Sequence, residues 1–377
     1  MKAPKKTWPA LATGVTALMA LTGWLDSWGW GPGVHRVEAQ GSPGAVYTMT
    51  NDTTDNRVIA YRRGVNGLLT PIGMFSTNGL GTGANLYSQG SVSLSPDHRF
   101  LFAVDAGSNE VSSFAVQANG SLTFVSKAPT SGLLPTSVTA YGNFLYVMNA
   151  SGNISGFTIA SDGSLTPIPN STRHLSSMMA RPGQVSFSND GTLLVVTEKY
   201  TNKIDTFTVA PDGLATGPLV QNSHGAEPFG FAFDNAGHLI VSEGVPSADS
   251  SYSVSSMGVL TVISGSVTDN EKQDCWVVNT NNPSFPTQYS YAANTGSGNI
   301  SSYTIGSTGT LTLLAAVAGS SAADARDMAL SADSNYLYVF ERAVGTIGGF
   351  SVQSNGSLMH ITKATGIPTT AYGLAGY

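Results

Sequence analysis

The sequence predicts an all-β fold, a seven-bladed β-propeller made of four-stranded antiparallel blades. Three observations lead to this prediction. One phrase recurs seven times along the 377 residues, each copy contains short runs of β-branched and aromatic residues, and no long helical period follows the N-terminal segment. Repeats of 40 to 50 residues built from strand-like segments are typical of propellers and solenoids.

The repeated phrase joins an aromatic residue to a glycine six positions later, with a leucine within the next two. "FAVQANGSL" begins at Phe114, and "FTIASDGSL" begins at Phe157. Glycine accepts the positive φ that tight turns require. We therefore expect a turn at each glycine, with the aromatic residue and the leucine packed between blades. The seven pairs are Tyr61 with Gly67, Phe114 with Gly120, Phe157 with Gly163, Phe207 with Gly213, Tyr252 with Gly258, Tyr303 with Gly309 and Phe350 with Gly356.

Residues 91–125 show the content of one copy. Strand-like runs occupy 91–95, 100–104, 111–116 and 121–125, separated by the turns "PDH", "DAGSN" and "QANG". Strands joined by such short turns are antiparallel neighbours. A four-stranded antiparallel unit repeated around a ring is a propeller blade.

The two ends of the repeat region predict how the ring closes. The first copy starts with "GAVYTMTND", which corresponds to the second strand of a blade, and a spare strand, "AYGLAGY", ends the chain at 371–377. We expect this last strand to become the innermost strand of the first blade, which removes free sheet edges. An open β-solenoid is the alternative, but it does not explain a missing first strand matched by a spare last one.

The first 39 residues read as a signal peptide. They combine a basic start, "MKAPKK", an apolar run, "WPALATGVTALMALTGWL", and small residues in "VEA" at 37–39. The propeller domain is then 40–377. An uncleaved anchor is the alternative, because the apolar run approaches the length that spans a bilayer. After cleavage we expect no membrane span, and a secreted or periplasmic location.

Composition narrows the classes of partner. Only 11% of residues are charged, the net charge is −6, and no basic patch favours nucleic acid. Cys275 is the single cysteine and reads as a small buried hydrophobe, so no internal disulfide forms. The six histidines lack metal-ligand spacing. We expect a monomer with no metal and no cofactor.

A column of polar residues ends the second strand of each blade. Three of the seven glutamates of the chain fall in it: Glu198, Glu243 and Glu341. Solvated turn residues are one interpretation. A functional acidic rim is another, and a calcium-binding rim is a third. The full column is Asn51, Asp105, Asn149, Glu198, Glu243, Asn294 and Glu341.

A second column precedes the innermost strands, which line the central channel. It contains Arg181 in "ARPGQ" and Arg326 in "ARDM", two of only nine arginines. An arginine at a channel mouth suits bidentate binding of a carboxylate or phosphate. The alternative is an Arg–Asp pair that ties blades together. Nearby polar or aromatic candidates for ligand binding are Gln184, Trp276 and Asp327 on these strands, Glu243 in the first column and His174 in the loop before the fourth blade.

The repeats resemble a known family. "SVSLSPDHRFLFAVDAGSNEVSSFAV", "PGQVSFSNDGTLLVVTEKYTNKIDTFTVAPDG" and "DMALSADSNYLYVFERAVGTIGGFSVQSNGSL" are similar to the seven-bladed lactonases, which include propeller-type 6-phosphogluconolactonases and the fungal carboxymuconate lactonizing enzyme. The resemblance spans roughly 44–377. "YVMNASGNI" and "YAANTGSGNI" also resemble YVTN-type surface-protein repeats, which are not enzymes.

The lactonase resemblance implies lactone opening or closing at the channel mouth. It implies an arginine at the innermost strand of the fourth blade and an acid at the end of the next strand, positions held here by Arg181 and Glu198. Arg326 matches a Pro-Arg pair of late blades, with Ala325 in place of the proline. The chain departs from the family at "ARPGQ", where members often carry "HPH". His174 is the histidine that can substitute from the preceding loop.

These observations give two functional hypotheses. The first is an exported lactonase-like propeller that takes a small lactone or acidic sugar. In it Arg181 and Arg326 hold the carboxylate or polarise the carbonyl, and Glu198 orients or deprotonates water. The second is a non-catalytic binding propeller at the cell surface or in the periplasm. Catalysis requires Arg181, Glu198 and Arg326 to converge on one pocket.

Overall fold

The computed structural model describes residues 1–2 and 43–377. The predicted signal peptide, 1–39, and its boundary with the propeller domain therefore lie outside the described residues, apart from the first two. Within the described part, none of the helices is long and apolar enough to cross a membrane.

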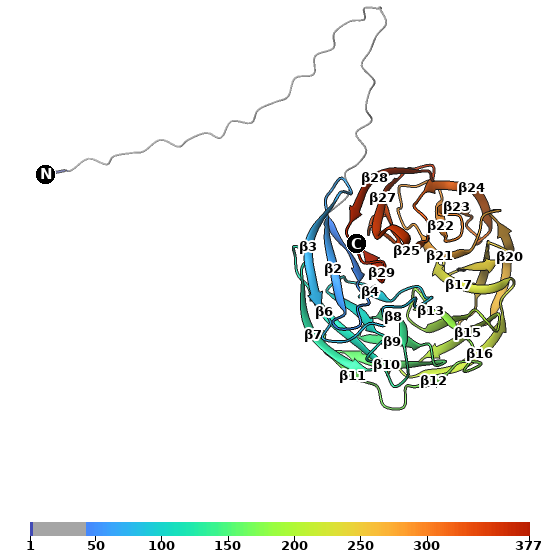
Figure 1. Cartoon of the computed structure of the whole chain (residues 1–377), viewed down its shortest axis with the longest axis horizontal. Helices are drawn as coiled ribbons and strands as arrows, with labels where there is room; N and C mark the ends of the chain where they lie inside the picture. Colours follow the sequence, from blue (N-terminus) through green and yellow to red (C-terminus); the bar gives the residue numbers. More distant parts are fainter. Residues whose placement is uncertain (3–42) are drawn as a thin grey trace, which may run out of the picture. The chain divides into compact units, whose positions relative to one another are not determined.

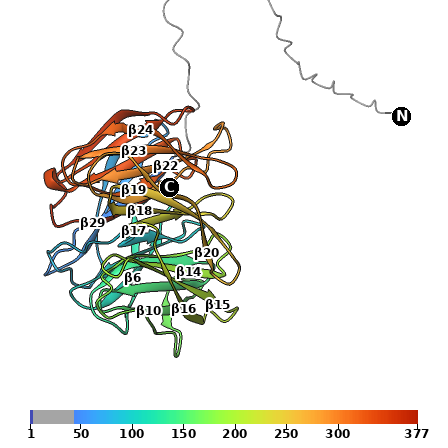
Figure 2. The same cartoon turned by 90° about the vertical axis from the view of Figure 1, so that its right-hand side faces the viewer.

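Residues 43–377 form a ring of seven antiparallel sheets, which confirms the predicted propeller (Figure 1). Blade one has the order β29-β1-β2-β3 from the centre outward. In each later blade, the first strand in sequence is the innermost one. In Figure 1, β4, β8 and β13 surround the centre, while β3, β7 and β16 lie on the outside. Figure 2 shows blades five and six side by side along the ring, consistent with the contacts between β17 and β21.

The first three blades contain twelve strands and the closing strand. Blade one consists of β29 (Tyr372–Gly376), β1 (Gly44–Met49), β2 (Arg57–Arg63) and β3 (Leu69–Ser76). Blade two consists of β4 (Val92–Leu94), β5 (Phe100–Asp105), β6 (Glu110–Val116) and β7 (Leu122–Pro129). Blade three consists of β8 (Pro135–Tyr141), β9 (Phe144–Asn149), β10 (Asn153–Ile159), β11 (Leu165–Pro167) and the short β12 (Arg173–His174), which also pairs with β10.

The remaining four blades are regular. Blade four consists of β13 (Pro182–Phe187), β14 (Leu193–Glu198), β15 (Lys203–Val209) and β16 (Ala215–Asn222). Blade five consists of β17 (Ala226–Phe233), β18 (Leu239–Val245), β19 (Ala248–Val254) and β20 (Leu260–Thr268). Blade six consists of β21 (Asp274–Asn279), β22 (Gln288–Asn294), β23 (Asn299–Ile305) and β24 (Leu311–Ser320). Blade seven consists of β25 (Ala325–Leu330), β26 (Tyr336–Glu341), the 3-10 turn η1 (Arg342–Val344), β27 (Thr346–Val352) and β28 (Leu358–Thr365).

The ring closes as the spare C-terminal strand predicts. β29 pairs antiparallel with β1, with Tyr47 opposite Ala375 and Val46 opposite Gly376. The first blade thus joins the two ends of the propeller domain. This pairing leaves no innermost strand missing and no open edge between blades one and seven.

The repeated glycine binds neighbouring blades together. Gly163 has φ +89, and the carbonyl of Gly163 accepts a hydrogen bond of 2.6 Å from Ser113 of the preceding blade. Five other copies do the same. A side chain at Gly163 would meet Phe100, since a Cβ there would lie 2.4 Å from that ring. The other donor and acceptor pairs are Tyr338 to Gly67, Tyr47 to Gly120, Tyr146 to Gly213, Thr206 to Gly258 and Tyr291 to Gly356.

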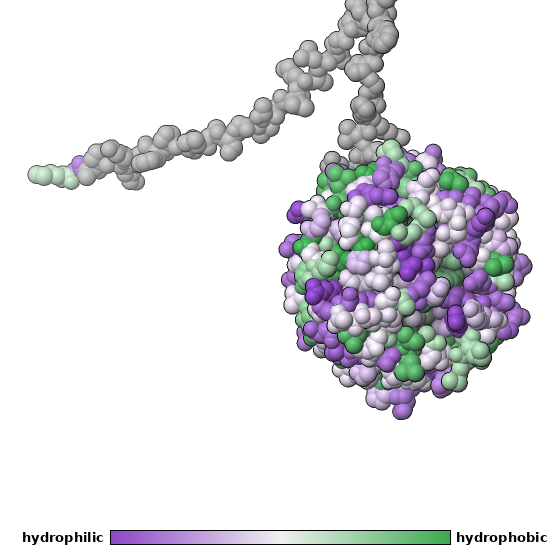
Figure 3. Space-filling view, in the orientation of Figure 1, coloured by the Kyte–Doolittle hydropathy of each residue, from purple (hydrophilic) through white to green (hydrophobic). Residues whose placement is uncertain are grey.

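The core lies between neighbouring blades. One buried cluster, for example, joins Tyr146 and Met148 of blade three to Val185, Leu194 and Val196 of blade four. The surface is mixed, and the face in Figure 3 shows hydrophobic residues interspersed with hydrophilic ones. The rigid ring fixes the ends of the innermost strands, where a site can form on the connecting loops.

Candidate active site

A cavity of about 510 Å³ opens where blades three, four and five meet the channel. Cavities of this size suit small-molecule ligands. It is bordered by the starts of innermost strands, the ends of second strands and the segment before β4. Its lining residues are Thr82, Ala84, Asn85, Leu86, Tyr87, Leu134, Thr136, Ala150, Arg181, Pro182, Lys199, Tyr200, Glu227 and Phe229.

The segment 85–91, between β3 and β4, links the blades around the channel. Gln89 binds two blades: its backbone N–H donates to Gly183 in blade four at 2.9 Å, and its side-chain amide donates to Val277 in blade six at 2.8 Å. The Ser88 hydroxyl donates to Thr136 of blade three at 2.7 Å. These bonds to three blades hold the segment in place as one wall of the cavity.

Two structural columns of the repeat supply the key side chains. The residue before an innermost strand, or at its start, has positive φ in several blades: Leu134 (+57), Arg181 (+46) and Glu227 (+57). The second column is the residue that follows the polar residue at the end of the second strand. It is Ala150 in blade three and Lys199 in blade four. The two columns lie together, because Ala150 N–H donates to Leu134 and Lys199 N–H donates to Arg181. At these positions blade three has two apolar residues, blade four has two cations, and blade five has the acid Glu227 in the first of the two columns.

Arg181 is exposed and lies at the cavity wall. Its guanidinium carbon is 4.7 Å from the centroid of the Tyr200 ring. The Tyr200 N–H donates to the carbonyl of Ala180 at 3.1 Å, which fixes the ring beside the arginine. A cation stacked on an aromatic ring is held in orientation while its N–H groups still point outward. Arg181 can therefore bind a carbonyl oxygen or a carboxylate in the cavity.

Lys199 is a buried amine with a perturbed charge. Its side chain donates to the Tyr87 carbonyl, and its nitrogen is 4.5 Å from the centroid of the Phe229 ring. Burial lowers the pKa of Lys199 to about 8, and the charge of Glu227 acts in the opposite direction. Among the described residues, no carboxylate lies within 4.0 Å of its nitrogen. At pH 7 the amine of Lys199 is therefore protonated, and the ammonium group can stabilise an anion that develops in the cavity.

Glu227 is the acid of the cavity. Its backbone N–H donates to Asn202 Oδ1 at 2.8 Å, which anchors its left-handed conformation. Its side chain lies over Gly244, where an added Cβ would be 3.0 Å from Glu227 Oε2. The residue is half-buried, and within the described residues its carboxylate accepts no hydrogen bond. It is therefore free to orient a water molecule.

Arg326 reaches the cavity only indirectly. Its guanidinium is buried, donates to Asp324 Oδ1 and Asn85 Oδ1 at 2.7 Å each, and also bonds the Tyr372 hydroxyl. The pair with Asp324 is local, because the two residues lie at the entry of the same blade, so it does not tie two blades together as the Arg–Asp alternative of the sequence requires. Asn85 lines the cavity, so Arg326 positions a residue of the wall and does not itself line it.

Glu198 is fully buried. Its carboxylate accepts bonds from the Ser176 backbone N–H at 2.8 Å, the Ser176 hydroxyl and the Thr201 hydroxyl. It does not line the cavity, although it directly precedes Lys199. The three residues expected to converge are thus divided: Arg181 borders the cavity, Arg326 supports it through Asn85, and Glu198 holds the loop that precedes blade four.

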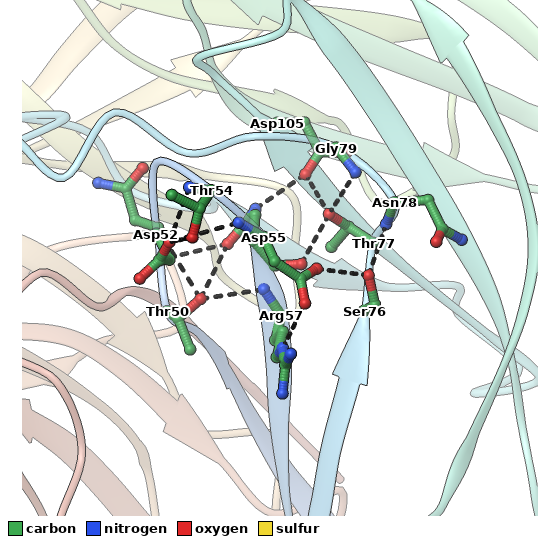
Figure 4. A network of polar contacts seen from close by, with 12 residues as sticks. Thr50, Asp52, Thr54, Asp55, Arg57, Ser76, Thr77, Asn78, Gly79 and Asp105 are labelled. Atoms are coloured by element: carbon green, nitrogen blue, oxygen red, sulfur yellow. Dashed lines mark hydrogen bonds and ion pairs between the residues drawn. The ribbon is translucent and has the colours of Figure 1, made fainter.

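The whole polar column is buried, so the expectations of solvated turns and of an acidic rim are both wrong. Every member is 0–2% exposed. Figure 4 shows the arrangement around Asp105, whose Oδ1 accepts a bond from Thr77 at 2.5 Å. Asn56 and Ser112 also donate to this carboxylate, and burial raises the pKa of Asp105 to about 6. These residues bind loops to strand ends between blades.

The described residues do not support the calcium-rim alternative. Among them, no three His, Cys, Asp or Glu side chains are placed to hold one metal ion. Glu243 is fully buried and accepts bonds from Ser250 and Ser266 at 2.5 Å each. It therefore acts as a local hub of the same kind as Asp105.

The other ligand candidates lie outside the cavity lining. His174 is exposed on β12 opposite Asn153. Gln184 accepts the Phe231 N–H at 2.7 Å inside the channel. Trp276 and Asp327 hold the segment before β4. The Trp276 indole donates to the Ser88 carbonyl at 3.1 Å, and Asp327 accepts the Gly90 N–H at 3.2 Å.

Lys199, Glu227 and the wall formed by 85–91 were not predicted from the sequence. Lys199 is one position beyond Glu198, and Glu227 is one position before Pro228, which begins the "PFGF" stretch of blade five. Each of these residues is therefore adjacent in sequence to a residue of the two columns that the sequence analysis considered. Aligning the blades by strand register, which the structure supplies, would have identified them.

Comparison with known proteins agrees with the fold. Residues 45–180, which hold β1 to β12, match the family described as "Lactonase, 7-bladed beta-propeller". The chain is a seven-bladed β-propeller, and this part of it is similar to that family. This confirms the resemblance expected from the repeats. No curated protein sequence gives a significant match.

Solved structures of similar fold cover nearly the whole propeller. A "putative 6-phosphogluconolactonase" from Bacteroides fragilis has a TM-score of 0.73 at 19% identity, over 90% of this chain and 99% of that one. A second, from Bacteroides uniformis, has a TM-score of 0.71 at 19% identity, over 88% and 98%. The periplasmic gluconolactonase of Pseudomonas aeruginosa has a TM-score of 0.67 at 16% identity, over 87% and 97%. At these identities the likeness shows the fold of the chain alone.

Proposed function

We propose that this chain hydrolyses a lactone in the cavity between blades three, four and five. The observation that carries the proposal is the meeting of Arg181, Lys199 and Glu227 in one cavity of about 510 Å³. Two cations and a free carboxylate are groups that can together promote ester hydrolysis, as donors to the developing oxyanion and as a general base.

Each group has a defined part in the reaction. Glu227 accepts a proton from a water molecule as that water attacks the lactone carbonyl. Negative charge then develops on the carbonyl oxygen, and Arg181 and Lys199 stabilise it. Collapse of the tetrahedral intermediate breaks the ring C–O bond, and the proton held by Glu227 passes to the leaving alkoxide. The product is a hydroxy acid, whose carboxylate Arg181 binds.

Glu198 and Arg326 have supporting parts in this proposal. Glu198 binds the loop that precedes Arg181, and Arg326 holds Asn85 in the wall. We further propose, from the sequence, that the chain is exported and acts as a monomer. The similarity in fold to the periplasmic gluconolactonase of Pseudomonas aeruginosa is consistent with a propeller of this type outside the cytoplasm.

The test measures hydrolysis of a panel of sugar, alkyl and dicarboxylic lactones by the purified propeller. Turnover is monitored by the release of acid. Arg181→Ala and Lys199→Met are expected to lower kcat/KM by roughly 100-fold each, the usual effect of removing an oxyanion donor. The matched control is Arg62→Ala, which removes an exposed cation from β2 of blade one, outside the cavity lining, and should leave turnover unchanged. Binding of a lactone without turnover would instead favour the non-catalytic binding propeller.

A further inference from the structure

The cavity has a charged end and an apolar end. Arg181, Lys199 and Glu227 come from blades four and five, whereas blade three contributes Leu134 and Ala150 together with one polar residue, Thr136. Leu86, from the segment before β4, adds to the apolar end and is buried. Since the two ends belong to different blades, a single ligand that fills the cavity contacts both.

Leu134 is held in place by its backbone. It has φ +57, a conformation that few leucines adopt, and two hydrogen bonds of 2.8 Å fix it. The bonds join its N–H to Asn109 Oδ1 and its carbonyl to the Ala150 N–H. The residue is nevertheless 45% exposed. The fold thus presents an apolar side chain to the cavity at the position where blade four presents Arg181 and blade five presents Glu227.

The apolar surface continues beyond the cavity. Leu133, Met178 and Met179 are 61%, 78% and 78% exposed. Their loops are in contact, since the Leu133 carbonyl accepts the Ser151 N–H and a Cβ at the next residue, Gly152, would lie 2.9 Å from Met178 Cα. Exposed apolar side chains that are contiguous with a pocket are typical of a ligand-binding surface.

We infer that the substrate is a lactone with an apolar substituent of several carbons, seated with its ring at the charged end and its substituent against Leu86, Leu134 and Ala150. This inference rests on the proposed function. An unsubstituted lactone would leave the apolar end unfilled, and a sugar would bury hydroxyl groups against the side chains of Leu86, Leu134 and Ala150, which offer no hydrogen bonds, so that this contact is unfavourable. Each methylene that leaves water for the apolar end should raise kcat/KM by up to about fourfold.

The experiment measures kcat/KM for γ-lactones whose alkyl substituent grows from one to six carbons. We expect a rise of about three- to fourfold per methylene, followed by a plateau when the apolar end is filled. Leu134→Asn, chosen because asparagine tolerates positive φ, should reduce this dependence on chain length. Met257→Asn, which removes a 69% exposed methionine from a turn of blade five, is the matched control and should keep it.

A second readout separates this inference from the proposed function. Calorimetry measures binding of the 4-hydroxyalkanoates, the ring-opened forms of the same series, and requires no turnover. Affinity that rises with chain length supports the inference even if every lactone proves inert, an outcome that would refute the proposed hydrolysis alone. Turnover with neither kcat/KM nor affinity dependent on chain length would overturn the inference and leave the proposed hydrolysis standing.

Discussion

Two buried acids between blades five and six should make the protein lose stability as pH rises. Asp249 in β19 and Asp274 in β21 are fully buried, and within the described structure no other residue donates a hydrogen bond to their carboxylates, which interact with each other. Burial, and then the charges of neighbouring acids, raises the pKa of both well above the usual value. The neighbouring acids are Asp269 and Glu243 for both residues, and Asp249 also raises the pKa of Asp274.

The direction follows from proton binding. Between the unfolded pKa of about 3.9 and the raised folded pKa, the folded state binds a proton that the unfolded state has lost, so stability falls as pH rises. Within that window one such group contributes at most about 1.4 kcal/mol per pH unit. An amide cannot ionise, so Asp249→Asn should remove at least one such contribution to the slope and be more stable than wild type at pH 8.

Urea unfolding at pH 5, 6, 7 and 8 measures this slope. Asp162→Asn is the control, because Asp162 is exposed in a turn, its pKa is lowered by hydrogen bonds from Ser164, and it stays ionised in both states over this range. If Asp249→Asn and wild type show the same dependence of unfolding free energy on pH, this reasoning is refuted.

Two further predictions concern the turn glycines and the cavity lysine. Gly163→Ala should destabilise the fold by about 2–4 kcal/mol, because strain at positive φ adds to a clash with Phe100. The control, Gly366→Ala, has φ +81 but no atom within 4 Å, and should cost only about 1–2 kcal/mol. Equal losses of stability in thermal or urea unfolding would show that the space around Gly163 does not matter. Lactone hydrolysis should decline as pH rises through about 8, where Lys199 loses its proton, and Lys199→Arg should move this decline to higher pH; a pH–rate profile that is identical in both proteins would exclude the lysine as the titrating group.

The sequence was sufficient to predict the fold because every blade repeats the same physical requirements. Gly163 and its equivalents need positive φ and close contact with the preceding blade, and both constraints are visible in the sequence as the repeated glycine. Closure by β29 was predictable for the same reason, since a strand missing at one end matched a spare strand at the other.

The site was less accessible to sequence reasoning because burial decides what an acid does. Glu198 and Glu227 are both rare glutamates near an innermost strand, yet one is fully enclosed by Ser176 and Thr201 while the other leans into a cavity over Gly244. A shift of one residue along a strand end moves a side chain from the interior to the surface. The wall at 85–91 depends on hydrogen bonds to residues that are distant in sequence, such as the bond from Gln89 to Val277. A local sequence pattern does not predict such bonds.

The most direct test of the proposed reaction compares Glu227→Gln with Glu198→Gln on the best lactone substrate, with thermal unfolding of both proteins measured in parallel. We predict that Glu227→Gln folds as wild type does and loses at least about 100-fold in kcat, the effect of removing a general base. Glu198→Gln should be less stable but, where folded, should still turn the substrate over. Full turnover by Glu227→Gln, with loss confined to a well-folded Glu198→Gln, would contradict the assignment of the reaction to this cavity.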